Sequence, residues 1–542
     1  MTPLFSRLSP FTSRIDTRSA SFKQNREEML AAIKGLRDCE GAVHATEQRA
    51  SARFSEGRLL PRRRIGLLLD RGAPYLELST LAGYRMHDDR DGSGAGGGLI
   101  GIIGSICGTR CLVNCSNSAV KGGTVSPAGL KKSLRAQQIA LENKLPLIHL
   151  VESGGANLAY QSEIFVEGGR SFANQARLSA AGIPQITVVH GSSTAGGAYI
   201  PGLSDYVIMV KGQAKVFLAG PPLLKAATGE IAGDEELGGA EMHARVAGTA
   251  DYLAENDRDA ILKVRSLVAA LNWNTNRKNL APVAFQEPRY PIEDLCGVVP
   301  VDFKNNYDVR EVMARLVDDS RFNEFKAELE PFTICCHAYL GGMALGIIGN
   351  NGPITSKGAN KAAQFIQLCC QSGTPILYLQ NTTGYMVGTE AEQSGIVKHG
   401  AKMIQAVANA SVPQITIAIG GSFGAGNYGM CGRGFDPRFI FSWPNARVGV
   451  MGPEQAAKVM SIITRAKLGR VGKKPDERHL AAMEKEIIDR MDAESTALFS
   501  TARLWDDGLI DPRDTRKLLL YLLSICEEER ELCPNSFGVA RM

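Results

Sequence analysis

The chain has 542 residues, of which 44% are hydrophobic and 22% charged, so it is long enough for two or more ordinary globular domains. Its net charge of +5 is small and its lysines and arginines are dispersed, which argues against a nucleic-acid partner. No apolar run reaches the ~18 residues of a membrane span, so we expect no membrane partner either.

The twelve cysteines form no disulfide or zinc pattern. Cys107, Cys111 and Cys115 are evenly spaced, but a turn at Gly108 interrupts them and no C-x2-C pair exists, so we expect free thiols and no metal. Residues 1–18 combine arginine and serine as transit peptides do, although Asp16 and the short length favour an ordinary arm. We therefore expect a bacterial cytoplasmic protein rather than one of the mitochondrial matrix.

The first half of the chain alternates between helix and strand patterns. Apolar residues at helical spacing predict helices over residues 23–55, and alternating β-type residues predict strands over 96–118. A Lys121-Gly-Gly-Thr124 turn is expected to open a helix that reaches residue 143. A strand over 147–151 then ends in the glycine turn Glu152-Ser-Gly-Gly-Ala-Asn157. This alternation predicts an α/β domain.

The second half repeats this organisation after a break in periodicity over residues 276–291. We place the domain boundary at Pro288, which gives domains 1–288 and 289–542. The expected elements are helices over 309–317, 360–371 and 398–409, a strand over 376–379, a loop over 380–388 and a charged helical tail after 473.

Two stretches of the chain align without a gap. Residues 183–199 match residues 412–428 at a constant offset of 229, and the same offset carries Pro146 onto Pro375. The chain is therefore predicted to be a tandem duplication of one fold.

Each copy reads as a strand, a glycine turn and a helix start, which lets backbone N–H groups approach a ligand. Two such turns predict two oxyanion sites. The alternative is that the glycines only allow tight turns and close packing. The segment Gly424-Ala-Gly-Asn-Tyr-Gly429 also matches a dinucleotide-binding pattern, but its twin does not, and Asp436 and Glu454 miss the expected position of the ribose-binding acid.

A conventional catalytic set is missing from the sequence, which has no G-x-S-x-G, H-E-x-x-H or P-loop pattern. His190 precedes the first glycine turn and is a candidate base, with a packed structural histidine as the alternative. Arg63 and Arg64 are candidates for phosphate contact, or for an exposed helix face. Oxyanion sites without an evident base indicate that a cofactor supplies the proton chemistry.

Several glycine-rich segments look like the motifs of one known family. These are Lys121-Gly-Gly-Thr, Glu152-Ser-Gly-Gly-Ala-Asn157, Ala195-Gly-Gly-Ala-Tyr199, Phe217-Leu-Ala-Gly-Pro-Pro222, Gly420-Gly-Ser-Phe-Gly-Ala-Gly-Asn-Tyr-Gly429 and Trp443-Pro-Asn-Ala-Arg-Val-Gly-Val-Met-Gly452. In these motifs the sequence resembles the carboxyltransferase β subunits of biotin-dependent acyl-CoA carboxylases, of the methylcrotonoyl-CoA branch. The resemblance extends over residues 15–542.

The resemblance implies a tandem duplicated crotonase-like (ClpP/crotonase) β-β-α superhelix fold of the α/β class. The N-terminal half would bind acyl-CoA, and the C-terminal half would receive carboxybiotin. The biotin would be carried on a separate α subunit that combines biotin carboxylase and carrier, in an assembly of six α and six β subunits with a β hexamer. This chain itself would bind no metal or nucleotide.

The family's site residues carry over by motif. The N–H groups of Gly196 and Gly197 would hold the thioester oxygen as an enolate forms, and those of Ala425 and Gly426 the ureido oxygen of biotin, whose anion takes the substrate proton. The resemblance also implies acyl-CoA contacts from Lys121, Gly122, Gly123, Thr124, Ser153, Gly154, Gly155, Ala156, Gly168 and Ala173, and biotin contacts from Thr383, Gly384, Tyr385, Phe423 and Gly424.

The sequence departs from the methylcrotonoyl pattern where that pattern is bulky. Gly168 replaces a phenylalanine and Ala173 an aromatic residue. Because buried methylenes contribute ~0.8 kcal/mol each, this room favours a longer acyl chain, and we expect geranyl-CoA, as in acyclic terpene catabolism. One alternative is 3-methylcrotonoyl-CoA in leucine catabolism, with Gly168 in a variable loop. The others are a biotin-independent hydratase or isomerase, and a non-catalytic assembly subunit.

Overall fold

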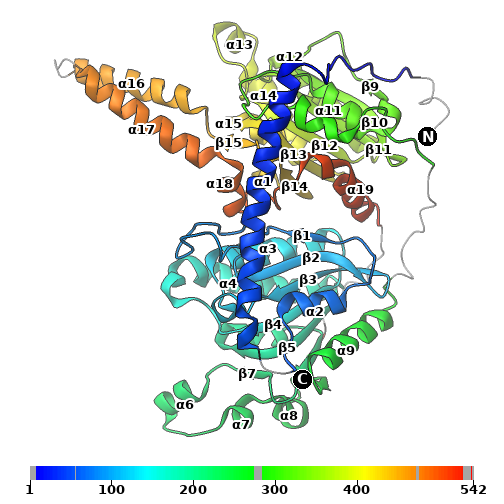
Figure 1. Cartoon of the computed structure of the whole chain (residues 1–542), viewed down its shortest axis with the longest axis vertical. Helices are drawn as coiled ribbons and strands as arrows, with labels where there is room; N and C mark the ends of the chain where they lie inside the picture. Colours follow the sequence, from blue (N-terminus) through cyan, green and yellow to red (C-terminus); the bar gives the residue numbers. More distant parts are fainter. Residues whose placement is uncertain (1–7, 55–56, 274–283, 471–474, 529–538, 540–542) are drawn as a thin grey trace. The chain divides into compact units, whose positions relative to one another are not determined.

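A computed structural model describes residues 8–54, 57–273, 284–470, 475–528 and 539 (Figure 1). The chain forms two compact units. One comprises Asp38–Asn279, Ala502–Leu504 and Glu528–Met542 and is called the N-terminal unit below. The other comprises Met1–Arg37, Leu280–Thr501 and Trp505–Glu527 and is called the C-terminal unit.

The N-terminal unit is built on one mixed sheet with strand order β1-β2-β3-β4-β5-β6-β8, in which β7 also pairs with β5. The pairs β1/β2 and β2/β3 are antiparallel, and the pairs from β3 onward are parallel. The strands are β1 Leu76–Leu78, β2 Leu99–Ile106, β3 Thr109–Ser116, β4 Leu147–Ser153, β5 Gln185–Thr194, β6 Tyr206–Val210, β7 Lys215–Phe217 and β8 Tyr252–Ala254.

Helices cover this sheet and place the ends of β4 and β5. Ser126 caps α3, because its Oγ accepts a hydrogen bond from the Gly129 N–H, and Asn256 caps α9 in the same way. The strands β4 and β5 are buried along nearly their whole length, as in a sheet covered on both faces. The main helices are α2 Pro61–Leu68, α3 Pro127–Glu142, α4 Gln161–Ala180 and α9 Asp257–Ala270.

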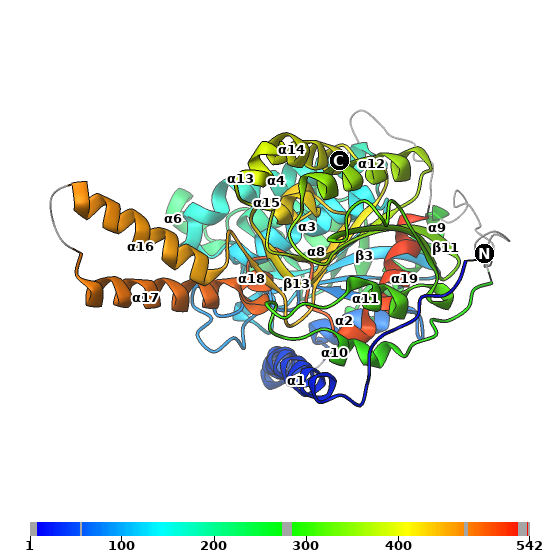
Figure 2. The same ribbon diagram turned by 90° about the horizontal axis from the view of Figure 1, so that it is seen from above.

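The C-terminal unit repeats this sheet with strand order β14-β13-β12-β11-β10-β9, and β15 pairs with β13. Its strands are β9 Phe322–Glu324, β10 Thr333–Leu340, β11 Met343–Asn350, β12 Ile376–Thr382, β13 Gln414–Phe423, β14 Phe439–Ser442 and β15 Arg447–Gly449. Its main helices are α11 Val309–Leu316, α12 Ser356–Gln371, α14 Ile396–Ala408, α16 Pro453–Arg470, α17 Glu477–Ser495 and α19 Thr515–Cys526. Figures 1 and 2 show α16 and α17 side by side as a hairpin that extends away from this sheet.

The duplication holds element by element. The helix pair α3/α12 starts at residues 127 and 356, β4/β12 at 147 and 376, and β5/β13 at 185 and 414, an offset of 229 each time. The preceding hairpin is offset by 234, since β3 starts at 109 and β11 at 343. The N-terminal copy therefore has five extra residues between this hairpin and α3, in the segment that holds Lys121, Gly122 and Gly123. The predicted tandem α/β fold is confirmed.

Some predicted boundaries differ from the structure. The helix expected at Lys121 begins only at Pro127, because Gly122 and Gly123 have φ of +64° and +71° and instead form a 3-10 turn. The helices predicted over residues 23–55 form one helix, α1 Ala20–Arg49. The break at 276–291 lies partly outside the described residues. All cysteines in the described part of the chain are free thiols, as predicted.

Within the described ranges, no helix is both long enough and apolar enough to cross a membrane. In the same residues, no group of three or more His, Cys, Asp and Glu side chains is arranged to hold a metal ion.

Candidate active site

The glycine turn over residues 152–157 follows β4 and is held by hydrogen bonds to a neighbouring loop. The Ser153 hydroxyl donates to the Gly123 carbonyl at 2.7 Å and accepts from the Gly155 N–H at 3.2 Å. The Val125 N–H donates to the Gly155 carbonyl at 2.9 Å, so residues 123–125 run beside the turn. A β carbon at Gly123 would lie 2.2 Å from the Glu152 carbonyl oxygen, so only glycine fits there.

The first of the two duplicated glycine turns follows β5, and its twin in the C-terminal copy is called the second turn below. Gly196 and Gly197 lie in the 3-10 turn Ala195–Ala198, and Ala195 has a φ of +52°, which is strained for a residue with a side chain. The Ser193 hydroxyl fixes the turn by donating to the Gly197 carbonyl at 2.9 Å. A helical turn directs its first N–H groups away from its own carbonyls, so the turn offers donors to a ligand.

These turns open on one cavity of about 150 Å³ in the N-terminal unit. Its walls come from β3, β4, α3 and α4. Of the predicted residues, the cavity is lined by Gly123, Ser153, Gly155, Ala156, Gly168, Gly196 and Gly197.

The other predicted acyl-CoA residues lie outside that cavity. Lys121 and Thr124 line a neighbouring hollow of about 40 Å³, and the Lys121 ammonium pairs with Asp88 at 2.5 Å. Gly122 and Gly154 belong to the two turns but do not line either hollow. Ala173 is half-buried on α4.

Gly168 lies inside α4, which is continuous over Gln161–Ala180, so the alternative that placed it in a loop is wrong. A β carbon at Gly168 would meet no atom within 4 Å, and the residue lines the cavity. Neighbouring Gly169 is equally unobstructed but is exposed and does not line it. The missing side chain at residue 168 therefore leaves open space on the cavity side of α4.

The C-terminal copy repeats this hydrogen bonding at the same offset of 229. The Gly384 N–H donates to the Thr382 hydroxyl at 3.2 Å, and the Ile354 N–H donates to the Gly384 carbonyl at 2.9 Å, as Gly155, Ser153 and Val125 do in the first copy. The twin of Ala195 is Gly424, whose φ of +56° is nearly the same. Two equivalent turns therefore exist, one in each unit.

The predicted biotin residues surround the second turn. A β carbon at Gly426 would lie 2.8 Å from the Gly384 Cα atom, so these two backbones touch. Gly424 and Ala425 line a cavity of about 620 Å³ that apolar side chains such as Val450, Met451 and Trp505 also bound.

The side chains of the predicted biotin residues differ in how accessible they are. Thr383 is exposed, whereas burial raises the pKa of Tyr385 to about 12 and its hydroxyl donates to the Gly400 carbonyl at 3.4 Å. The Phe423 ring is buried and packs on Phe303 with ring centroids 5.1 Å apart. Phe423 therefore has only its backbone available to a ligand.

A buried ionic network that the sequence did not predict lies behind the first turn. Arg64 is fully buried and pairs with Glu152 at 2.7 Å and with Asp257 at 3.0 Å. Asp257 also accepts from the His190 Nδ1 at 2.8 Å, and Arg58 pairs with Glu152 from the other side. Arg64 is thus neither on an exposed helix face nor available to a phosphate.

The environment of His190 opposes a role as a base. Burial and the Arg64 charge lower the pKa of His190 to about 4, despite its hydrogen bond to Asp257. Burial alone would raise the pKa of Asp257, but the His190 hydrogen bond and the Arg64 charge lower it to about 2. A neutral imidazole with no exposed surface is the packed histidine of the two alternatives.

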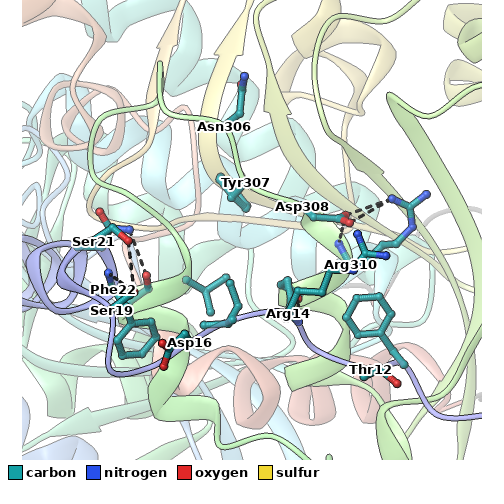
Figure 3. Close-up of a pocket in the computed structure, with 16 residues that line it drawn as sticks. Thr12, Arg14, Asp16, Ser19, Ser21, Phe22, Asn306, Tyr307, Asp308 and Arg310 are labelled. Carbon is teal, nitrogen blue, oxygen red and sulfur yellow. Dashed lines mark hydrogen bonds and ion pairs between the residues drawn. The ribbon is translucent and has the colours of Figure 1, made fainter.

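A third hollow, of about 820 Å³, lies in the C-terminal unit between residues 11–25 and the segment that leads into α11 (Figure 3). Its polar wall includes Asp308 and Arg310, which pair with each other, and Arg310 also pairs with Glu324 at 2.8 Å. None of the predicted site residues lines this hollow.

Comparison with known proteins places this geometry in a family. The family model described as "Carboxyl transferase domain" matches residues 52–538. The chain belongs to that family. The structure of this carboxyltransferase superposes on the crystal structure of the P. aeruginosa geranyl-CoA carboxylase beta subunit with a TM-score of 0.93, and the two sequences are 59% identical. The superposition covers 98% of this chain and 100% of the other.

Two curated relatives show how wide the similarity is. The probable mitochondrial methylcrotonoyl-CoA carboxylase beta chain of Drosophila melanogaster is 48% identical, with 98% of this chain and 95% of the relative covered. The biotin-dependent 3-methylcrotonyl-coenzyme A carboxylase beta1 subunit of Mycobacterium tuberculosis is 45% identical, with 96% and 98% covered. The predicted family, a carboxyltransferase β subunit of the biotin-dependent acyl-CoA carboxylase type, is confirmed.

Proposed function

We propose that this carboxyltransferase acts in a geranyl-CoA carboxylase and moves a carboxyl group from carboxybiotin to the γ carbon of geranyl-CoA. The observation that supports it is Gly168, whose missing side chain leaves open space in the cavity beside Gly196 and Gly197. The prenyl extension of geranyl-CoA adds five carbons to the 3-methylcrotonoyl group, and the space that a side chain at residue 168 would occupy is available to it.

The first glycine turn supplies the electrostatics of the proposed reaction. When the γ C–H bond breaks, its electron pair delocalises through the α,β double bond onto the thioester oxygen. The N–H groups of Gly196 and Gly197 hold that oxygen as its charge grows, which lowers the barrier by ~2.7–4 kcal/mol per donor. The delocalised electron pair would then return to form a bond from the γ carbon to CO2, which cleavage of the N–C bond of carboxybiotin would release. The other acyl-CoA contacts are assigned to Lys121, Gly122, Gly123, Thr124, Ser153, Gly154, Gly155, Ala156, Gly168 and Ala173.

The second glycine turn is assigned to biotin. Carboxybiotin would supply the carboxyl group there, because cleavage of its N–CO2 bond would release CO2 and leave a ureido nitrogen able to take up the substrate proton. The residues fit such a group, because the 620 Å³ cavity beside Gly424 and Ala425 is large and bounded partly by apolar side chains. The N–H groups of Ala425 and Gly426 hold the ureido oxygen, and Thr383, Gly384, Tyr385, Phe423 and Gly424 shape the surroundings.

The functional division follows the duplication. Residues 1–288 are assigned to acyl-CoA and residues 289–542 to carboxybiotin. The partner is a biotinylated α subunit with biotin carboxylase and carrier functions, and the assembly is six α subunits around a β hexamer, in the bacterial cytoplasm. These assignments rest on the similarity to β chains of biotin-dependent carboxylases.

A second candidate substrate is 3-methylcrotonoyl-CoA. It is favoured by four relatives of 45% to 48% identity whose names refer to methylcrotonoyl-CoA or 3-methylcrotonyl-CoA carboxylase, although a fifth in this range is named only as a probable biotin-dependent acyl-CoA carboxylase beta2 subunit. The two candidates share the reactive β-methyl enoyl head and differ only in the prenyl extension, so both turns would act identically on them.

The deciding experiment is ATP-dependent bicarbonate fixation by this chain combined with its α subunit. We expect a higher kcat/KM for geranyl-CoA than for 3-methylcrotonoyl-CoA. Turnover of 3-methylcrotonoyl-CoA alone would keep the carboxyltransferase assignment and remove the geranyl substrate. Turnover of enoyl-CoA without biotin would favour a hydratase or isomerase, and no transfer at all would favour an assembly subunit.

A further inference from the structure

The far end of the acyl cavity carries polar side-chain atoms without hydrogen-bond partners in the described part of the chain. Asn114 on β3 is 3% exposed, and neither its amide nitrogen nor its amide oxygen has a partner among the described residues. His149 on β4 is buried with an unpartnered Nε2 atom, and Gln175 on α4 is buried with an unpartnered Oε1 atom. All three line the cavity that begins at Gly196 and Gly197.

The strand register places Asn114 and His149 side by side at one depth. Asn114 and His149 are direct partners across the parallel pair β3/β4, so their side chains lie on the same face of the sheet. Ser153, Val151 and His149 alternate along that face of β4 and all line the cavity. From Ser153 to His149 is four residues, or about 13 Å along the strand. We call Asn114, His149 and Gln175 the polar floor.

The duplicated fold shows that this polarity is not a structural requirement. The counterparts of Asn114 and His149 in the C-terminal copy are Ile348 and Tyr378, which pair in the same register between β11 and β12. Both are fully buried in an apolar cluster, and the Tyr378 hydroxyl is satisfied by donating to the Gln414 Oε1 at 2.8 Å. The same scaffold is therefore built with an apolar, fully satisfied pair at these positions.

Leaving buried polar groups unpaired is costly, so proteins normally satisfy them. Asn114 offers both a donor and an acceptor. Burial lowers the pKa of His149 to about 4, so its ring is neutral and its unpartnered Nε2 atom either donates or accepts, depending on the tautomer. None of the described residues that line the cavity is an acid, a lysine or an arginine, so the floor suits an uncharged group that both donates and accepts.

We propose that the polar floor recognises a hydroxyl group at the far end of the acyl chain, so that the preferred substrate is a geranyl-type thioester hydroxylated at its terminal carbon. The proposal rests on the geranyl-type function above and names its substrate class more closely. An eight-carbon chain with bonds of ~1.5 Å extends at most about 10 Å. A hydrogen bond from a hydroxyl at its end adds about 3 Å, so the fully extended chain spans the ~13 Å to Asn114 and His149 only with that hydrogen bond, when the thioester oxygen lies at Gly196 and Gly197.

The test compares three thioesters with the assembled holoenzyme: geranyl-CoA, the same compound with one hydroxyl on its terminal carbon, and 3-methylcrotonoyl-CoA. We expect kcat/KM for the hydroxylated compound to exceed that for geranyl-CoA by about tenfold, which is the effect of one well-made hydrogen bond. An equal or lower value for the hydroxylated compound would overturn the proposal while leaving the geranyl-type function intact. Turnover of 3-methylcrotonoyl-CoA alone would overturn both.

Two variants exploit the duplication. Asn114→Ile gives the N-terminal copy the residue of its twin, and we expect it to reverse the preference in favour of geranyl-CoA. Ile348→Asn is the matched control, since it creates the same buried amide in the C-terminal copy, and it should lower Tm without changing the ratio of the two kcat/KM values. An unchanged ratio in a folded Asn114→Ile enzyme would contradict the role of the floor, and the wild-type comparison decides even if that variant does not fold.

Discussion

The replacement Gly168→Phe tests the space on α4 directly. A phenylalanine ring at this position is expected to enter the cavity, because Gly168 lines it and no atom of the described residues lies within 4 Å of the β carbon that would carry the ring. It then occupies the room assigned to the five extra carbons of geranyl-CoA. At ~0.8 kcal/mol per buried carbon these contribute about 4 kcal/mol, or roughly a thousandfold in kcat/KM. We expect a loss approaching this size for geranyl-CoA and a much smaller loss for 3-methylcrotonoyl-CoA.

The assay is bicarbonate fixation by the holoenzyme with each substrate, at equal concentrations of folded variant. Gly169→Phe is the matched control, because Gly169 is the next residue of the same helix, is equally unobstructed and does not line the cavity. Neither replacement should weaken α4, since glycine is the poorer helix former by a few tenths of a kcal/mol. If Gly168→Phe kept the geranyl preference, or if Gly169→Phe lost it equally, the steric reasoning would be refuted.

Two further results are expected. Gly426→Ala should reduce carboxyl transfer at least a hundredfold while acyl-CoA binding persists, because its β carbon would press on Gly384 at 2.8 Å. The control is Gly469→Ala, whose β carbon would meet no described atom within 4 Å. Equal activities of the two variants would contradict the assignment of the second turn to biotin. The second variant is His149→Gln, for which the free energy of unfolding in urea is measured near pH 7 and near pH 4. The decrease between these two pH values should be about 3 kcal/mol smaller for His149→Gln than for the wild type. The reason is that the imidazole takes up a proton below pH ~6.5 in the unfolded chain but only below about 4 when buried. Wild-type stability is therefore lost as the pH falls through that window, and parallel curves for the two proteins would exclude the effect.

Much of the fold was predictable because its signals are local. Proline, glycine and apolar runs fix strand starts, turns and buried strands within a few residues of themselves, and the gapless repeat at 229 supplied the long-range relation that local signals lack. The twin turns were predictable for the same reason. Gly424 and its twin Ala195 both adopt the left-handed backbone conformation, Ala195 despite its side chain.

The ionic network behind the first turn could not be predicted in this way. Arg64 meets Glu152 across 88 residues and Asp257 across 193, and neither separation leaves a periodic trace in the sequence. A run of three arginines before an apolar stretch is typical of an exposed helix, so the pattern pointed away from the buried partner. The position of Gly168 inside a helix was also not predictable, because two adjacent glycines are poor helix formers and suggest a loop.

The polar floor shows what a duplicated chain adds to sequence reasoning. Asn114 and His149, taken alone, are unremarkable polar residues in strands that are otherwise apolar, and either could be satisfied by a side chain distant in sequence. Ile348 and Tyr378 occupy the same paired positions of the same scaffold and show that the fold is complete without that polarity. The polar pair Asn114 and His149 leaves hydrogen bonds unmade and gains no packing over its apolar counterpart. We therefore attribute this difference between the two copies to what the N-terminal cavity binds. That reasoning locates substrate discrimination in two places of the N-terminal unit, the open space at Gly168 and the unpaired groups beyond it.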